Sequence, residues 1–258
     1  MTGGRLAVVG LGPGAHAWRT PEASARLAEA TDLVGYGPYL HLVGDLASQP
    51  VRHEFDNREE AERARLALDL AADGRDVVVV SSGDPGIFAM ATAVVEELHR
   101  GDDGRYAAVE VSVVPGITAA SAAAARVGAP LGHDFCCLSL SDVLKPWPVV
   151  EQRLMAVATA DFVVALYNPI SRHRPWQLGR AIEILREHRA PSTPVVLGRD
   201  VGRDGEATRV TTLADFDAAE VDMRTVVIVG STTTRAFCDA GGRTWVYTPR
   251  SYPAAAPS

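Results

Sequence analysis

A run of four valines at positions 77–80 is the feature that most constrains how this chain folds. Four consecutive β-branched residues are typical of a short strand that is buried on both faces. The run ends at Ser81-Ser82-Gly83-Asp84-Pro85-Gly86, and the alanine-rich apolar segment 87–98 that follows has the length of a helix. This order of strand, tight turn and helix places Gly83 and Asp84 at the carboxyl end of a sheet strand, where open α/β sheets bind ligands.

Two more predicted strands end in a similar loop. Residues 6–9 lead into Gly10-Leu11-Gly12-Pro13-Gly14, and residues 109–114 lead into Pro115-Gly116-Ile117-Thr118, which a small-residue helix follows. One such loop by itself is better explained as a plain surface turn, because turns favour Gly, Asp and Pro. Three of them at one sheet edge favour a binding site.

The first loop also suggests a dinucleotide-binding protein, and two features disfavour that interpretation. The fingerprint needs its third glycine in a helix that starts at once, whereas the best helix start here is Thr20 as N-cap with Pro21 at the first helical position. The next strand, 31–34, ends in Gly35-Tyr36-Gly37-Pro38 without the expected ribose-binding acid. An NAD(P)-dependent oxidoreductase and a non-catalytic binding module remain alternatives.

The pattern of strands and loops starts again after residue 130, which predicts a second α/β domain. We expect domains at 1–130 and 131–248 and a disordered Pro/Ala/Ser-rich tail at 249–258. Within the first domain, 36–40 is expected to be a turn-rich segment and 59–72 an amphipathic helix. Within the second, the expected strands are 137–140, 161–166, 194–197 and 225–229, with helices near 148–158 and 175–188, a hairpin across 202–205 and an edge strand at 243–247.

Composition narrows the function classes. The formal charge of −7 and a pI near 5.5 argue against a nucleic-acid binder with a broad basic face. Three cysteines without ligand spacing indicate free thiols, not a metal site or a disulfide framework. No window has the roughly 18 apolar residues of a membrane span, and no signal-peptide pattern is present. We therefore expect a cytoplasmic protein with no membrane association.

The three loops together, in this order and spacing, resemble the tetrapyrrole (corrin/porphyrin) methyltransferases, a family that uses S-adenosylmethionine. The similar segments are Gly10-Leu11-Gly12-Pro13-Gly14, Ser82-Gly83-Asp84-Pro85 and Pro115-Gly116-Ile117-Thr118-Ala119. The resemblance extends from Val8 to about Phe237. It implies two α/β domains, with the cofactor in the cleft between them, in a homodimer.

Further motifs are similar to one branch, which methylates precorrin-3B at carbon 17 with ring contraction to precorrin-4 in cobalamin (vitamin B12) biosynthesis. They are Gly35-Tyr36-Gly37-Pro38-Tyr39, Gly86-Ile87-Phe88-Ala89-Met90 after the second loop, Leu138-Ser139-Leu140-Ser141-Asp142-Val143-Leu144 with Pro146-Trp147, and Leu166-Tyr167-Asn168-Pro169 with Ser171 and Arg174. A cobalt-precorrin-3 substrate and a sister enzyme acting at another ring carbon remain alternatives.

The resemblance also implies which residues bind the cofactor. From the first domain they are Pro13, Ser82, Gly83, Asp84, Ile87, Phe88, Thr118 and Ala119, and from the second Asn168, Gly198, Gly230 and Ser231. Asp84 is expected either to accept from the cofactor's ammonium group or to cap the following helix. The segment Gly230-Ser231-Thr232-Thr233-Thr234 departs from the branch's Gly-Asn-Ser-x-Thr, which leaves the contact of Ser231 open.

Methyl transfer from a sulfonium needs a nucleophilic carbon held about 3–3.5 Å from the methyl group, and no metal or nucleophilic triad. Ring contraction needs a proton acceptor for a hydroxyl, for which His133, Asp142 and Tyr167 are candidates by residue type. A loop position for His133, an N-cap role for Asp142 and cofactor packing for Tyr167 are the simpler explanations of these three residues. Lys145, Arg172, His173 and Arg174 are candidate partners for substrate carboxylates, and a solvated surface position is the alternative for each. Gly12 and Gly14 complete the predicted substrate set, and the role of His16 is open.

Overall fold

The computed structural model describes residues 4–56, 58–101 and 104–252. They form two α/β units that divide between Thr118 and Ala119. The division falls before the boundary predicted at residue 130, because helix α5 (Ala119–Val127) packs on strands of the C-terminal unit. The predicted tail lies outside the described residues from position 253 onwards. Within the described ranges, every helix is too short or too polar to cross a bilayer.

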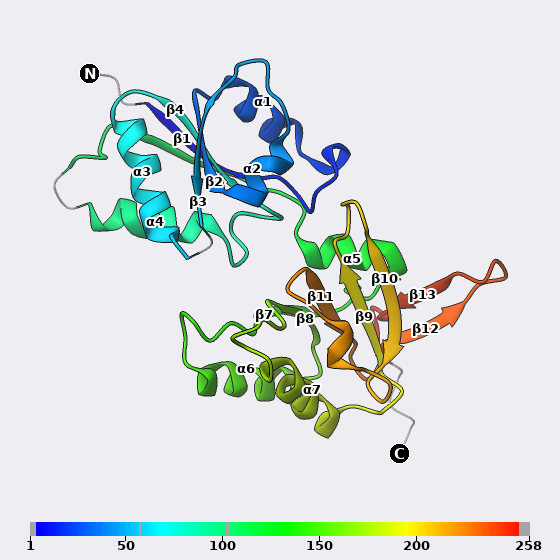
Figure 1. The fold of residues 1–258 in the computed structure, drawn as a ribbon. Helices are drawn as coiled ribbons and strands as arrows, with labels where there is room; N and C mark the ends of the chain where they lie inside the picture. Colours follow the sequence, from blue (N-terminus) through cyan, green and yellow to red (C-terminus); the bar gives the residue numbers. More distant parts are fainter. Residues whose placement is uncertain (1–3, 57, 102–103, 253–258) are drawn as a thin grey trace. The chain divides into compact units, whose positions relative to one another are not determined.

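The N-terminal unit is a five-stranded parallel sheet in the order β3-β2-β4-β1-β5 (Figure 1). Its strands are β1 (Arg5–Gly10), β2 (Asp32–Tyr36), β3 (Val51–Phe55), β4 (Asp76–Ser81) and β5 (Glu110–Val114). Its helices are η1 (His16–Trp18), α1 (Pro21–Glu29), α2 (Gly37–Val43), α3 (Glu60–Ala72) and α4 (Met90–Arg100).

Alternation along the strands divides the core of this unit into two layers. Leu6 and Val8 of β1 pack with α3 and α4 on one face of the sheet. Ala7 and Val9 pack with α1 and α2 on the other. The valine run lies in β4 between β2 and β1, buried on both faces as predicted.

Two local predictions for this unit are wrong, and one strand was missed. The segment 36–40, expected to be a turn, begins helix α2, with Pro38 in its first turn. Strand β3 was not predicted, because an exposed edge strand with polar residues on both faces carries no apolar run. Helix α4 begins at Met90 rather than near residue 87, since Phe88 has a left-handed φ of 53°. The cap of α1 is confirmed, because Thr20 accepts a hydrogen bond from the Ala23 amide.

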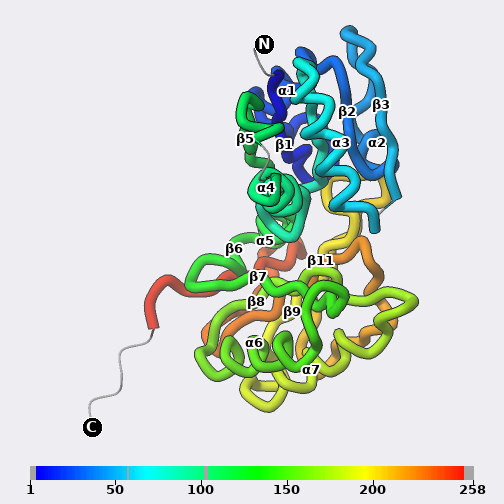
Figure 2. The backbone as a smooth tube through the Cα atoms, turned by 90° about the vertical axis from the view of Figure 1, so that its left-hand side faces the viewer, coloured from blue at the N-terminus to red at the C-terminus, as the bar shows by residue number. Residues whose placement is uncertain are grey.

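The C-terminal unit has a mixed sheet in the order β10-β9-β11-β8-β7 (Figure 1). The strands are β7 (Phe135–Ser139), β8 (Val163–Tyr167), β9 (Pro194–Arg199), β10 (Ala207–Thr212) and β11 (Thr225–Val229). Helices α6 (Trp147–Thr159) and α7 (Gln177–His188), side by side in Figure 2, cover one face, α5 covers the other, and η2 (Ala218–Glu220) precedes β11.

Strand directions decide which loops of this unit meet. β7 and β8 are parallel, and β11 is antiparallel to both β8 and β9. The carboxyl ends of β7, β8 and β9 therefore share one edge with the amino end of β11. The predicted β9–β10 hairpin is confirmed. Burial raises the pKa of the Cys136 thiol on β7 to about 11, so it packs as a protonated, weakly polar group.

A second, small sheet completes the C-terminal unit. Its order is β12-β13-β6, with bounds β6 (Gly128–Ala129), β12 (Arg235–Cys238) and β13 (Thr244–Tyr247). β13 was predicted as an edge strand, and it lies instead between its two partners. β12 was not predicted, because all four of its residues are exposed and mixed in character.

Candidate functional site

Three glycine-rich loops meet at one edge of the N-terminal sheet. Strands β4, β1 and β5 are neighbours and run in the same direction, so the loops that follow them emerge together. This confirms the prediction that the three loops share an edge. We call these segments, residues 10–14, 82–88 and 115–118, the loop lattice.

Backbone hydrogen bonds join the first two loops. The Gly83 amide donates to the Gly12 carbonyl at 2.8 Å, and the Gly12 amide donates back to the Gly83 carbonyl at 3.2 Å. The Leu11 amide donates to the Ser81 carbonyl at 2.8 Å. Gly12 and Gly83 both have φ near 70°, a conformation in which a side chain is strained.

Close approach of the backbones requires glycine at two further positions. A Cβ on Gly116 would lie 2.3 Å from the Gly83 carbonyl oxygen, and a Cβ on Gly10 would lie 2.7 Å from the same atom. Both distances are far below van der Waals contact with backbone that cannot easily move. The three loops are therefore packed so closely that glycine is a steric requirement.

Asp84 joins the second and third loops. Its Oδ1 accepts from the Gly86 amide at 2.8 Å, and its Oδ2 accepts from the Gly116 amide at 3.1 Å. Among the described contacts, α4 receives no side-chain cap at its N-cap residue, Ala89. The capping role considered for Asp84 is therefore wrong, because the helix starts too late for this carboxylate to reach it.

The other predicted cofactor residues of this unit line the same lattice. Pro13 is buried, Ser82, Ile87 and Thr118 are half-buried, and Phe88 is 49% exposed. Backbone groups of glycine loops can hold polar parts of a ligand without bulky side chains in the way. An exposed aromatic ring beside them offers apolar contact area.

In the C-terminal unit, Asn168 sits at the carboxyl end of β8 in a left-handed conformation with φ 51°. Its Nδ2 donates to the Ser139 hydroxyl at 2.9 Å, and its carbonyl accepts from Arg174 at 2.7 Å. Arg174 is 7% exposed and also donates to the Leu140 carbonyl at 3.5 Å. It was predicted to bind substrate carboxylates, and the structure corrects this, because its guanidinium is buried against backbone carbonyls.

The three candidate proton acceptors do not come together. Asp142 follows β7 and Tyr167 ends β8 at the shared edge, whereas His133 precedes β7 at the opposite edge. The six residue-to-residue steps from His133 to Ser139 span about 20 Å when extended. The expectation that His133 lies among these loops is therefore wrong.

Asp142 and Tyr167 have protein partners of their own. The Gln177 amide donates to Asp142 Oδ2 at 2.9 Å. The Tyr167 hydroxyl accepts from the Ala120 amide at 2.9 Å and so satisfies an amide in the first turn of α5. Their proposed part in proton transfer has to compete with these contacts.

Two of the predicted cofactor residues of this unit lie away from Asn168. Gly230 and Ser231 follow β11, which runs antiparallel, so they lie at the opposite sheet edge. Gly230 is four residues beyond Val226, the partner of Gly198, or roughly 13 Å along the strand. Their grouping with Asn168 was wrong because the sequence does not reveal strand direction.

Local packing accounts for the residues at both of these edges. A Cβ on Gly198 would lie 2.5 Å from the Ala123 Cβ, so the packing of α5 on β9 requires glycine there. Ser231 is buried, and its hydroxyl lies 3.0 Å from that of Thr233 and 3.3 Å from that of Thr234.

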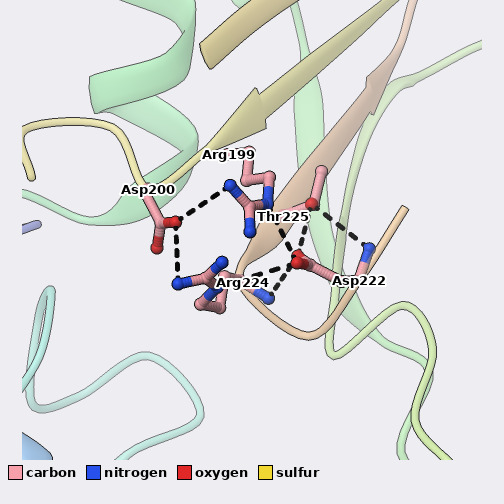
Figure 3. A network of polar contacts seen from close by, with 5 residues as sticks. All are labelled: Arg199, Asp200, Asp222, Arg224 and Thr225. Carbon is pink, nitrogen blue, oxygen red and sulfur yellow. Dashed lines mark hydrogen bonds and ion pairs between the residues drawn. The ribbon is translucent and has the colours of Figure 1, made fainter. Parts of the chain in front are cut away.

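An ion-pair network that the sequence did not reveal lies at the carboxyl end of β9 (Figure 3). Asp200 is buried, with Arg199 at 3.4 Å and Arg224 at 3.3 Å from its Oδ2. Arg199 also pairs with Asp222 at 2.9 Å, and Asp222 accepts from Thr225 at 3.0 Å. The sequence does carry a signal for this network, because the opposite charges Arg199-Asp200 lie at the end of β9 and Asp222 and Arg224 lie just before β11.

Two predicted substrate cations keep access to solvent. Arg172 is exposed, and Lys145 is half-buried. Burial, with a smaller contribution from the charge of Arg153, lowers the pKa of Lys145 below its ordinary value. An anion beside Lys145 would reverse that shift.

Several known proteins are similar to this chain over most of its length. The chain is 51% identical to the precorrin-3B C(17)-methyltransferase of a Sinorhizobium species, over 96% of this chain and 97% of that protein. It is 44% identical to the probable cobalt-factor III C(17)-methyltransferase of Salmonella typhimurium over 89% of this chain and 93% of that one. It is 52% identical over 98% of its length to the cobalamin biosynthesis protein CobIJ of Mycobacterium tuberculosis, of which it spans about half, 49%.

Solved structures give the same result. The crystal structure of the methyltransferase CobJ matches with a TM-score of 0.89 and 49% identity, over 95% of this chain and all of that one. Uroporphyrin-III C-methyltransferase from Thermus thermophilus, complexed with S-adenosylhomocysteine, matches with a TM-score of 0.64 and 25% identity over 88% and 92% of the two chains. The family model of tetrapyrrole (corrin/porphyrin) methylases matches residues 5–217, and the chain belongs to this family.

Proposed function

We propose that the chain transfers a methyl group from S-adenosylmethionine to carbon 17 of precorrin-3B, with ring contraction to precorrin-4, in cobalamin biosynthesis. The observation that carries the proposal is the near full-length similarity to the Sinorhizobium enzyme of that name. The loop lattice also supports the proposal. The contacts between its loops described above are made by backbone groups and by the Asp84 carboxylate, so these contacts involve no bulky side chain.

The lattice suits a cofactor with polar and apolar parts. Backbone amides and carbonyls of residues 10–14 and 82–88 are proposed to hold the polar groups of S-adenosylmethionine, with Phe88 against an apolar part. The S-adenosylhomocysteine complex of the Thermus relative supports the choice of cofactor. Thr118, Ala119, Asn168 and Gly198 are further proposed contacts.

The reaction asks little of the side chains. Displacement at a sulfonium is driven by placing the ring carbon in line with the methyl group, which is worth several kcal/mol of barrier. The developing neutral thioether needs no proton donor. Ring contraction needs a base, and Asp142 and Tyr167 are the proposed candidates that remain at the sheet edge.

The structure disfavours the alternative of an NAD(P)-dependent dehydrogenase. At the carboxyl end of β2, where a ribose-binding acid would be needed, the chain has Gly35 and Tyr36, and a helix follows at once. Asp32, the acid of this strand, lies at its other end, where His53 and Arg75 pair with it at 2.8 and 2.7 Å.

The test is incubation of the purified protein with S-adenosylmethionine and precorrin-3B, followed by mass spectrometry. We expect a product that has gained a methyl group in place of a hydrogen, with one S-adenosylhomocysteine formed for each product. The same assay with cobalt-factor III examines the second candidate substrate, which the similarity to the Salmonella protein favours. No product from either tetrapyrrole would contradict the proposal.

A further inference from the structure

Two adjacent aliphatic side chains in the C-terminal unit stand almost free in solvent. Val143 is 75% exposed and Leu144 86%, the two highest values among large apolar side chains in the described ranges. They lie in the loop between β7 and α6, residues 141–146, which we call the apolar loop. Full burial of such side chains is worth about 1.5–3 kcal/mol each, so their exposure leaves binding energy unused.

The apolar loop is held firmly at both ends. At its start, Asp142 accepts from Gln177, which is 1% exposed, at 2.9 Å. At its end, Trp147 packs edge-to-face against Trp176 with ring centroids 4.8 Å apart. Both contacts lead to the start of α7, whose N-cap is Trp176 and whose first residue is Gln177. Anchoring a loop at both ends reduces the conformational entropy that it loses when a ligand binds.

The position of the apolar loop gives it a specific chemical character. It follows the carboxyl end of β7, next to the Asn168 loop at the carboxyl end of β8. Lys145 follows Leu144 directly, and Arg172 is exposed in the neighbouring loop. The surface therefore combines an apolar centre with nearby positive charge.

We infer that the apolar loop binds the tetrapyrrole substrate, with Val143 and Leu144 against the apolar ring system and Lys145 and Arg172 near its peripheral carboxylates. This inference rests on the proposed function and names the part of the chain that selects the substrate class. A second copy of the chain is a poorer occupant, because two side chains are far from the roughly 800 Å² per partner of a stable interface.

The test is the double variant Val143→Thr with Leu144→Gln, which keeps size and removes apolar surface. We expect KM for precorrin-3B to rise about tenfold, while kcat and the Kd for S-adenosylhomocysteine change less than twofold. Uroporphyrin III, a stable polycarboxylated tetrapyrrole, serves as a direct binding probe by fluorescence titration, and its Kd is expected to rise by a similar factor. Met155→Gln on α6 is the matched control, since Met155 is also exposed and lies in the second half of that helix.

The outcomes separate the inference from the proposed function. Turnover of precorrin-3B by the wild type, with KM and probe affinity unchanged in the double variant, overturns the inference alone. Absent turnover, with probe affinity lost only in the double variant, contradicts the proposed function and supports the inference. If neither protein binds any tetrapyrrole, both are wrong. A change in sedimentation from dimer to monomer in the double variant would assign the loop to self-association and overturn the inference.

Discussion

The two units hold their loops by different chemistry. In the N-terminal unit, backbone bonds between Gly12 and Gly83 and the single carboxylate of Asp84 fix the loop lattice. In the C-terminal unit, long side chains fix the loops. Arg174 donates to a backbone carbonyl, and Arg199 and Arg224 form ion pairs with Asp222 and Asp200 (Figure 3).

The difference follows from how closely the backbones approach. Three adjacent parallel strands bring their loops within van der Waals contact, where there is room for glycine only. In the mixed sheet, Arg174 links the loops that follow β7 and β8, and Arg199 and Arg224 link the end of β9 to the segment before the antiparallel β11. The first arrangement is held mainly by backbone groups, and the second by charged side chains.

The largest expected effect comes from Gly116→Ala. Its Cβ would meet the Gly83 carbonyl at 2.3 Å, so we expect the free energy of unfolding to fall by about 3 kcal/mol in urea titrations. The affinity for S-adenosylhomocysteine should fall at least tenfold. Gly179→Ala in α7 is the control, since a Cβ there meets no described atom within 4 Å and should add about 0.5–1 kcal/mol. Equal stability of the Gly116 variant and the wild type would mean that the lattice is not closely packed.

Arg174→Met should cost about 2 kcal/mol of unfolding free energy, because the Asn168 carbonyl loses a buried donor. Arg172→Met, two positions away and exposed, should change it by less than about 0.5 kcal/mol. The opposite pattern, a stable Arg174 variant with a raised KM, would return Arg174 to the substrate site that the sequence suggested.

Asp84→Asn tests a side chain that joins two loops of the lattice. An amide can accept from only one of the two backbone N–H groups that Asp84 now satisfies, so about 1–1.5 kcal/mol should be lost. Asp217→Asn is the matched control, because Asp217 accepts only from the exposed Ala219 amide among its described contacts. Cofactor affinity that is unchanged in the Asp84 variant would separate this residue from the site.

The smallest effect is expected for Arg224→Ala. The guanidinium is more than half exposed, so the loss should stay below about 1 kcal/mol. It should vanish in about 1 M NaCl, where the screening length falls to about 3 Å. The loss in Gly116→Ala should persist in the same salt. A salt-resistant Arg224 effect would show that the charged rim is as rigid as the loop lattice.

The sequence predicts well that the three N-terminal loops share one sheet edge, because the signals for this are local. Glycine is required where backbones touch, and the valine run places its loop at the sheet edge, so the loops could be located without knowing any long-range contact. The C-terminal site was harder to predict. Gly230 was predicted at the wrong sheet edge because the sequence does not show that β11 runs antiparallel to β9. His133 was wrongly grouped with Tyr167, because His133 precedes β7 and therefore lies at the opposite edge.

The roles of individual side chains could not be predicted from the sequence either. An arginine in a loop is usually solvated, and nothing local to Arg174 indicates that it is buried under its own loop. The Arg199–Asp200–Asp222–Arg224 network likewise depends on two segments meeting across the sheet. Such contacts are set by tertiary structure, which residue type and spacing do not specify.

The most direct test of the central claim is hydrogen–deuterium exchange of the protein with and without S-adenosylhomocysteine. If the loop lattice holds the cofactor through its backbone, amides in residues 10–14, 82–88 and 115–118 will exchange more slowly in the complex. Tight binding that leaves exchange in all three segments unchanged would contradict the account.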